Sequence, residues 1–314
     1  LLLLSLFFVV LSAGFLLIFL KADGDFTLLS KKIVKSEEIE DKVIWITGAS
    51  RGIGEVLAQK LASLGAKLII SARNEAELIR VKTRLTGKYA PAEVMILPLD
   101  LALGEEHLAE AVQKAESFFG GAGVDIIFHN AAHERPKSSA LDFPEAGLKV
   151  TFEVNVLGPI TLSRLLVPHM LKRGKGQLVV MSSASGKVPA PGQAVYSGTK
   201  FAVAGFFHSL RSELCQRGIK VTVVCPGPVE TPTAASTEKR ISVDRCADLT
   251  IIAASHGLKE AWISCQPVLT TMYLAQYMPT VGFWLMDKVG KNRIAAVSAK
   301  ENAYSLRLLF GKNK

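Results

Sequence analysis

The 314-residue chain is poor in cysteine, and the spacing of its cysteines excludes several kinds of site. The four cysteines, at positions 215, 225, 246 and 265, form no Cys-x-x-Cys pair, which argues against a metal site or a redox dithiol. Cys225 lies in an apolar, strand-like run and is expected in the core. Arginine-rich helices and zinc-finger spacings are also missing, so the net charge of +9 reflects dispersed surface residues. We therefore expect no metal and no nucleic-acid partner.

Residues 1–20 contain no charged side chain. As a helix, this run would rise about 30 Å, which matches the hydrocarbon core of a bilayer. A secretory signal has a shorter apolar centre, of about 7 to 15 residues, and ends in a small-residue cleavage site. Here the run leads directly to Lys21, Ala22 and Asp23. We favour an uncleaved single-pass transmembrane anchor over a cleaved signal. Three lysines between residues 31 and 35 weakly favour a cytosolic body, and the side of the membrane stays open.

A polar connector, residues 21–41, precedes a glycine-rich motif. Residues 43–46 are apolar and predict a buried strand. The sequence Thr-Gly-Ala-Ser-Arg-Gly-Ile-Gly follows at 47–54, and a helical pattern then runs to Leu64 and stops at Gly65. A strand, a glycine turn and a helix form the context of a dinucleotide-binding site, because glycines admit a pyrophosphate to the helix N-terminus. The spacing, Gly-x-x-x-Gly-x-Gly, differs from the ordinary fingerprint.

The end of the second predicted strand, residues 67–71, bears on the choice of cofactor. Sites that prefer NAD usually carry an acidic residue there, which binds the ribose 2′-hydroxyl. This chain has Ala72 and Arg73 instead, and Arg51 of the glycine turn could reach the same place. Arginine side chains bind phosphate well, so the pair favours NADP(H) over NAD(H). The alternative is that both arginines are merely solvated.

Strand and helix patterns alternate along the chain. Alternation of this kind predicts an α/β fold with a Rossmann-type, doubly wound parallel sheet. The ligand should then lie beyond the carboxyl ends of the strands. Further strands are predicted at 94–99, 124–128, 177–181 and 221–225, with helices at 75–85, 105–118, 148–170 (broken near Gly158-Pro159) and from the Tyr196 region to Arg217.

Tyr196 and Lys200 are four residues apart and would share one face of a helix. A phenol titrates near pH 10, too high for proton exchange at neutral pH. A nearby ammonium favours the phenolate and lowers that pKa, so the pair could work as a general acid/base. Taken alone, this spacing arises by chance on many helices. The other motifs give it weight.

In order and interval, these motifs resemble those of the classical short-chain dehydrogenases/reductases. The match covers roughly residues 41–232 and includes Asn155 and Ser183, the latter thirteen residues before Tyr196. The resemblance implies that Tyr196 exchanges the proton and that Lys200 also bonds the nicotinamide ribose. Ser183 would hold the substrate oxygen, and Asn155 would hold a water connecting Lys200 to solvent. The residues expected at the cofactor are Gly48, Ser50, Arg51, Gly52, Ile53, Gly54, Arg73, Asp100, Asn130, Tyr196, Lys200, Pro226, Gly227, Val229 and Thr231.

One segment departs from the family pattern. The family usually has Asn-Asn-Ala-Gly after its fourth strand, and this chain has His129, Asn130, Ala131 and Ala132. The methyl group of Ala132 puts the detailed fit near the adenosine in doubt, because glycine allows positive φ and close backbone approach. We expect His129 to be a packed strand-end residue.

The C-terminal part carries a narrower resemblance. The segments 262–264, 273–280 and 288–293, together with 22–25, resemble one membrane-bound branch of the family. That branch implies a reductase of the endoplasmic reticulum membrane acting on lipophilic carbonyls or alcohols such as steroids or retinoids, with homodimers expected. The exact substrate and the reaction direction stay open. We divide the chain into an anchor (1–20), a connector (21–41), a catalytic domain (42–260) and an extension (261–314). Residues 268–286 are apolar and could contact membrane lipid, cover the substrate or form core. A non-catalytic NADP(H)-binding scaffold at a membrane is the alternative function.

Overall fold

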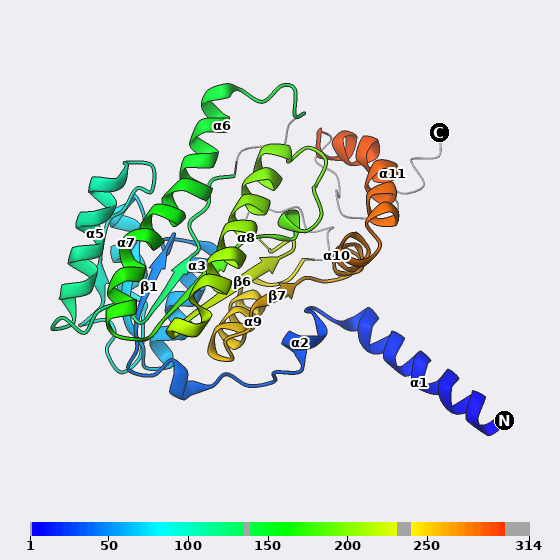
Figure 1. Ribbon diagram of the computed structural model, residues 1–314, viewed down its shortest axis with the longest axis horizontal. Coiled ribbons are helices and arrows are strands. Elements are labelled where there is room, and N and C mark those ends of the chain that lie inside the picture. Colours follow the sequence, from blue (N-terminus) through cyan, green and yellow to red (C-terminus); the bar gives the residue numbers. More distant parts are fainter. Residues whose placement is uncertain (1, 135–138, 231–239, 299–314) are drawn as a thin grey trace.

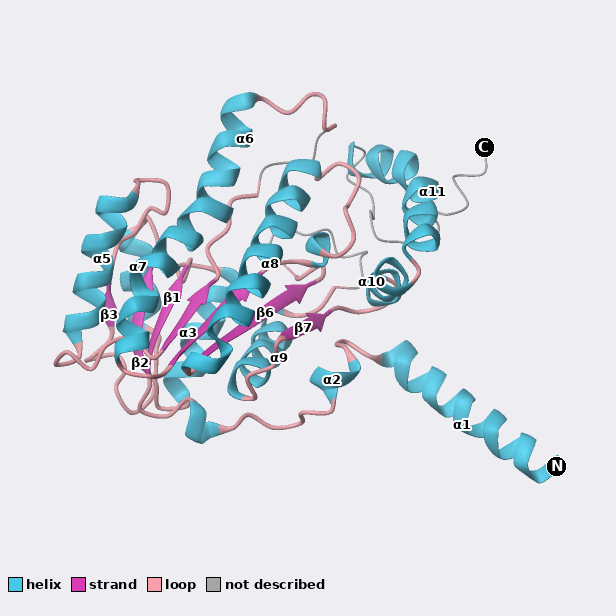
Figure 2. Ribbon diagram, in the orientation of Figure 1, coloured by secondary structure: helices cyan, strands magenta, loops and turns pink. Residues whose placement is uncertain are grey.

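The computed structural model describes residues 2–134, 139–230 and 240–298. Within them, seven parallel strands form one sheet in the order β3-β2-β1-β4-β5-β6-β7 (Figure 2). The order reverses between β1 and β4, so this is a doubly wound sheet, and its strands end at one common edge. The strands are β1 Val43–Thr47, β2 Lys67–Ser71, β3 Met95–Ile96, β4 Ile126–His129, β5 Gly176–Met181, β6 Ile219–Pro226 and β7 Glu260–Ile263.

Helices cover both faces of the sheet (Figure 1). One core lies between the sheet and α3 Gly52–Ser63, α4 Glu75–Thr83 and α9 Val243–Ser255. The other core lies under α5 Glu105–Phe118, α6 Glu145–Phe152, α7 Gly158–Lys172 and α8 Ala194–Leu214. The predicted α/β fold is therefore confirmed.

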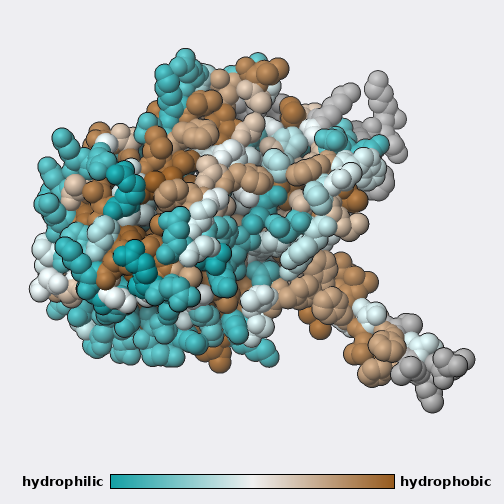
Figure 3. Space-filling model, in the orientation of Figure 1, coloured by the Kyte–Doolittle hydropathy of each residue, from teal (hydrophilic) through white to brown (hydrophobic). Residues whose placement is uncertain are grey.

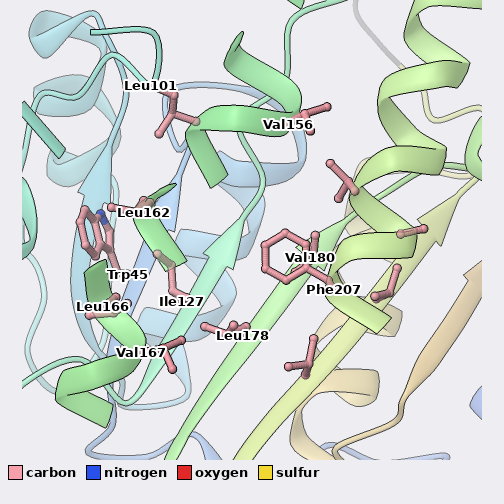
Figure 4. Close-up of a cluster of buried hydrophobic side chains, with 14 of the residues drawn as sticks. Trp45, Leu101, Ile127, Val156, Leu162, Leu166, Val167, Leu178, Val180 and Phe207 are labelled. Atoms are coloured by element: carbon pink, nitrogen blue, oxygen red, sulfur yellow. The ribbon is translucent and has the colours of Figure 1, made fainter. Parts of the chain in front are cut away.

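Strand β1 shows why the sequence forms a central strand. Trp45 packs beside Leu162 and Leu166 in one core (Figure 4), while Ile44 and Ile46 belong to the other. A strand buried on both faces needs apolar side chains at every position, which explains the continuous apolar run. The one polar atom of the Trp45 side chain, Nε1, donates a hydrogen bond to Ser71 Oγ at 2.8 Å.

The predicted break near Gly158-Pro159 is wrong, because residues 145–172 form one continuous helix. A π-helical turn, Glu153–Leu157, joins α6 to α7. Pro159 has no N–H to donate to the carbonyl four residues earlier, and a wider turn avoids that α-helical requirement. The amide of Gly158 bonds instead to the carbonyl of Glu153, five residues back. Among the described residues, Glu145–Lys172 is the one helix whose length and apolar composition would allow a membrane span, but half of its apolar window is buried inside the protein; Val10–Lys21 is a shorter apolar helix.

Other predicted boundaries shift slightly. The strand expected at 94–99 is reduced to β3, because Pro98 cannot donate to the ladder at this sheet edge. The amides of Leu97 and Leu99 nevertheless bond to the carbonyls of Ile70 and Ala72. The last turn before Arg217 is a 3₁₀ turn, Cys215–Arg217. Neither α9 nor β7 was predicted, and β7 extends the sheet beyond residue 260.

The connector is attached to the catalytic domain along its length. Asp25 caps the short helix α2, Phe26–Leu29, and its Oδ2 accepts a hydrogen bond from the amide of Trp262 at 2.7 Å. Leu28 is fully buried. Further along, the amide of Lys35 donates to Ser255 Oγ. The connector therefore runs along β7 and α9.

The terminal helices lie apart from the sheet. Helix α1, Leu2–Lys21, projects away from the rest of the protein (Figure 1). Helices α10, Val268–Tyr277, and α11, Pro279–Ser298, follow β7 and bend at Met278. They lie beyond the carboxyl ends of β6 and β7 (Figure 2).

Candidate active site

The glycine turn lies between β1 and α3 and is closed by Asn130, at the end of β4. The Nδ2 of Asn130 donates to the carbonyls of Thr47 (3.0 Å) and Gly48 (3.1 Å). Thr47 Oγ1 accepts from the amide of Asn130 at 3.1 Å. Gly48 has φ 68°, which glycine adopts readily. At Gly54, a Cβ would lie 2.2 Å from the carbonyl oxygen of Gly48, so the helix packs against the turn with no room for a side chain.

The N-terminus of α3 has the properties of an anion-binding site. Its N-cap residue, Arg51, makes no side-chain capping bond. A Cβ on Gly52 would meet no atom within 4 Å, so the space above this helix end is open. Uncapped N–H groups and the positive end of the helix dipole both favour a phosphate. The residues present therefore fit the pyrophosphate of a dinucleotide.

The other cofactor candidates lie in this turn or in the segments that follow β2 and β3. Arg51 and Arg73 are exposed, and neither side chain has a partner among the described residues. Ser50 and Ile53 are half-buried members of the turn, and the carbonyl of Ser50 accepts from Arg80 at 2.8 Å. Sequence reasoning missed Arg80, which also pairs with Glu55 of α3. Asp100 lies after β3 and accepts a bond from the amide of Ala102.

Tyr196 and Lys200 lie on α8, and Ser183 follows the end of β5. The Nζ of Lys200 lies 5.5 Å from the centre of the Tyr196 ring and donates to the carbonyl of Met181 at 2.8 Å. Ser183 follows Met181 by two residues, and its hydroxyl reaches the carbonyl of Pro226 at 3.5 Å. Burial lowers the pKa of Lys200 to about 8, against the opposing charge of Glu134. The buried amine of Lys200 thus lies beside the Tyr196 ring and against the strand end that leads to Ser183.

Asn155 connects the loop after β4 to the helix that carries Tyr196. Its Oδ1 accepts from the amide of His133 at 2.6 Å, and its Nδ2 donates to the carbonyl of His133 and to Thr199 Oγ1. Thr199 in turn donates to the carbonyl of Tyr196 at 2.7 Å. The side chain of Asn155 therefore fixes two site segments. The expected water-holding role stays a prediction.

The segment after β6 closes this edge of the sheet. Pro226 is the last residue of β6, and the amide of Gly227 donates to the carbonyl of Ile263. A Cβ on Gly227 would lie 2.1 Å from Ser264 Oγ, so glycine is required for this close approach. Val229 pairs with Ile241 in an isolated bridge. Thr231, also predicted at the cofactor, lies outside the described residues.

His129 at the end of β4 and Ala132 just after it are the two residues that depart from the family pattern. His129 is buried, and its Nε2 lies 2.8 Å from Ser163 Oγ. Burial lowers its pKa to about 3, so it is a neutral packing residue, as predicted. Among the described residues other than glycine, Asp41 is the one with a positive φ, so the φ of Ala132 is negative. The departure from the family pattern therefore causes no backbone strain there.

The predicted core position of Cys225 is confirmed. All four cysteines are free, and Cys225 is buried, with its pKa raised to about 12 by burial. The described residues contain no group of three or more His, Cys, Asp or Glu side chains able to hold a metal ion.

A polar connection that sequence reasoning missed joins the C-terminal helix to the site. Arg293 of α11 donates to Gln193 Oε1, and Gln193 donates to Glu134. Gln193 is the N-cap of α8. These residues are far apart in the sequence and belong to no recognised motif, so only the folded chain shows the connection.

Comparison with known proteins agrees with this geometry. A family model described as short chain dehydrogenase matches residues 42–242. The chain belongs to this oxidoreductase family. Human Dehydrogenase/reductase SDR family member 7 is 38% identical over 320 residues, which cover 95% of this chain and 93% of the human protein. A Drosophila melanogaster protein named Dehydrogenase/reductase SDR family protein 7-like is 31% identical over 80% of this chain and 81% of its own length.

Solved structures share the fold. A 3-ketoacyl-(acyl-carrier-protein) reductase from Brucella melitensis, complexed with NADH, has a TM-score of 0.62 and 27% identity, and the match covers 69% of this chain and 91% of that one. A metagenomic short-chain oxidoreductase in complex with NADP has a TM-score of 0.59 and 27% identity, covering 69% and 92%. The two complexes contain different dinucleotides, so the fold alone does not select between them.

Proposed function

We propose that the protein is a membrane-anchored, NADP(H)-dependent oxidoreductase that acts on a lipophilic carbonyl or alcohol. The observation that carries the proposal is the buried amine of Lys200, which lies beside the Tyr196 ring and bonds to the carbonyl of Met181, two residues before Ser183. A non-catalytic member of the family would not need to keep all three groups. The uncapped N-terminus of α3 supports dinucleotide binding at the same edge.

The proposed chemistry divides between the cofactor and the chain. A bound nicotinamide supplies or accepts the hydride. Tyr196 gives a proton to the carbonyl oxygen during reduction and takes it back during oxidation. The Lys200 ammonium stabilises the phenolate, and the hydroxyl of Ser183 donates to the substrate oxygen as charge develops there. Asn155 holds the helix of Tyr196 against the loop after β4.

The preference for NADP(H) rests on Arg51 and Arg73. Both are exposed beside the glycine turn, with no side-chain partner among the described residues. Two guanidinium groups at this position would bind a 2′-phosphate and would have no such ligand on NAD(H).

Helix α1 supports the membrane assignment. It has 20 residues, and Lys21 provides its only charge. Phe8, Phe15 and Ile18 are each more than half exposed. The proposed span rests on the charge-free sequence of residues 1–20, which as a helix is about as long as a bilayer core is thick, and the endoplasmic reticulum is the compartment that the family branch implies. An anchored enzyme meets lipophilic substrates in the bilayer, where such molecules concentrate.

A homodimer is part of the proposal. The helix 145–172 and α8 expose Leu157 (48%) and Phe201 (43%). Large apolar side chains at the surface of neighbouring helices suit a contact with a second copy.

The variant Tyr196→Phe tests the catalytic proposal. Turnover of NADPH with a panel of lipophilic ketones and aldehydes should fall by about 10²- to 10⁴-fold, while the Kd for NADPH stays the same. Tyr89→Phe is the matched control, because Tyr89 is a half-buried tyrosine outside the site that bonds to Asp41 before β1. Equal turnover in Tyr196→Phe and the wild type would refute the mechanism. NADPH binding without turnover of any substrate would favour a non-catalytic scaffold.

A further inference from the structure

Helices α10 and α11 expose a group of large apolar side chains where they meet. Tyr277 is 73% exposed, Met278 53%, Val281 39%, Phe283 45% and Trp284 55%. We call these five residues the aromatic face. Solvent exposure of so many large apolar side chains within eight positions is unfavourable in water and indicates an interaction surface.

The aromatic face is continuous with the last turns of α1. Tyr273 of α10 lies 5.7 Å from the ring of Phe19, 5.9 Å from Phe26 and 6.2 Å from Tyr277, measured between ring centres. Phe15 stacks on Phe26 at 4.9 Å. The hydrophobic surface of α1 continues onto the adjoining body in Figure 3. One layer of rings therefore connects α1 to α10.

The composition of this segment suits the interface of a bilayer. Residues 268–286 contain no charged side chain, and the first charges after them are Asp287 and Lys288. The Nζ of Lys288 lies 5.5 Å from the centre of the Trp284 ring. Tyrosine and tryptophan prefer the headgroup level, and a neighbouring lysine can reach the lipid phosphates.

We propose that the aromatic face lies in the interface of the same bilayer that α1 enters. The inference rests on the proposal that α1 is a membrane anchor. A second copy of the chain is a less suitable occupant, because the face borders α1 and would have to be covered together with it. The same helix also contacts the site: a Cβ on Gly290 would lie 3.5 Å from Pro191, and Arg293 bonds to Gln193. Membrane contact would therefore place the segment that leads to Tyr196 next to lipid, and a lipophilic substrate could enter from the bilayer.

The tryptophans allow a direct test in the full-length protein. The chain has three, and Trp45 (0% exposed) and Trp262 (7%) are buried, while Trp284 is exposed. The protein is reconstituted into phosphatidylcholine vesicles with or without brominated acyl chains, because bromine quenches tryptophan emission at short range. We expect the brominated lipid to quench part of the tryptophan emission of the wild type. The variant Trp284→Phe should lose this quenching, and the variant Trp45→Phe should still show it.

A relocated tryptophan provides the control. In the Trp284→Phe background, Phe118→Trp places a tryptophan at a position of similar exposure (46%) on α5, on the side of the sheet remote from α10 (Figure 1). It should not be quenched. If Trp284 emission is unquenched while the protein still floats with vesicles at alkaline pH, the aromatic face is not in the bilayer and the inference fails, although the anchor stands. Loss of flotation would overturn the anchor and, with it, the inference. A blue shift of the Trp284 emission maximum without quenching would show that a protein partner covers the aromatic face, and this result would also overturn the inference.

Discussion

Arg293 of α11 donates a hydrogen bond from Nη2 to Oε1 of Gln193, at 3.2 Å and a distance of 100 residues along the chain. Arg293 is only 5% exposed. Gln193 precedes Tyr196 by three residues and also accepts, through its carbonyl, the amide of Ser197. The C-terminal helix is therefore tied to the first turn of the helix that carries Tyr196.

Removing the arginine should disturb catalysis more than cofactor binding. A hydrogen bond to a charged group contributes about 1.5–3 kcal/mol. We expect Arg293→Met to lower kcat/KM by about 10- to 100-fold, with an unchanged Kd for NADPH and partial rescue by Arg293→Lys. Ala295→Ser, at an exposed neighbour on α11, is the control. Unchanged kcat/KM in Arg293→Met would show that the contact does not position the site.

Gly54 should tolerate no side chain. A Cβ there would lie 2.2 Å from the Gly48 oxygen and 2.5 Å from Asn130 Nδ2, so Gly54→Ala must displace the turn. We expect a loss of about 1–3 kcal/mol in the free energy of unfolding and weaker NADPH binding. At Gly205 of α8, a Cβ would meet nothing within 4 Å, so Gly205→Ala should stabilise the protein by about 0.4–1 kcal/mol. Denaturant unfolding in detergent measures the free energy of unfolding, and cofactor titration measures the Kd for NADPH. If Gly54→Ala and Gly205→Ala change the free energy of unfolding equally, the packing argument is contradicted.

Cofactor choice should depend on Arg73. We expect Arg73→Ala to weaken NADPH binding by about 10-fold or more and to leave NADH nearly unaffected, since one charge-assisted bond to phosphate is lost. Arg217 is an exposed arginine before β6, at the opposite edge of the sheet. The control variant Arg217→Ala should alter neither the affinity for NADPH nor the affinity for NADH. Equal losses of NADPH and NADH affinity in Arg73→Ala would remove the argument for NADP(H).

The buried Lys200 makes stability depend on pH. Burial lowers its pKa to about 8 from the ordinary 10.5, so between these values the unfolded chain binds more protons than the folded one. Stability should then rise with pH across this window, by at most about 1.4 kcal/mol per unit, and the cost of burial is fully present below pH 8. Compared with Lys200→Met, the wild type should gain stability from pH 8 to pH 10. If the difference in unfolding free energy between the wild type and Lys200→Met does not change from pH 8 to pH 10, the pKa of Lys200 in the folded protein is not lowered to about 8.

Local signals predicted much of the fold, and the roles of the predicted site residues stay predictions. Apolar runs predicted β1, β2, β5 and β6, and the glycine spacing located the turn before α3. The features that were not predicted depend on the position of a strand at the sheet edge or on contacts between distant segments. Pro98 shortens β3, and the π turn carries the helix through Pro159. The contacts among Glu134, Gln193 and Arg293 join three segments with no shared periodicity, and no spacing rule could reveal them.

The π turn at Glu153–Leu157 also sets the relative phase of α6 and α7. It presents Asn155 to His133 and Thr199, while α7 turns Leu162 and Leu166 into the core. Deleting one residue from this turn would rotate the two halves by about 100° relative to each other. Either the amide of Asn155 or the two leucines would then lose their neighbours. The length of this turn, and not only the identity of Asn155, therefore positions the site.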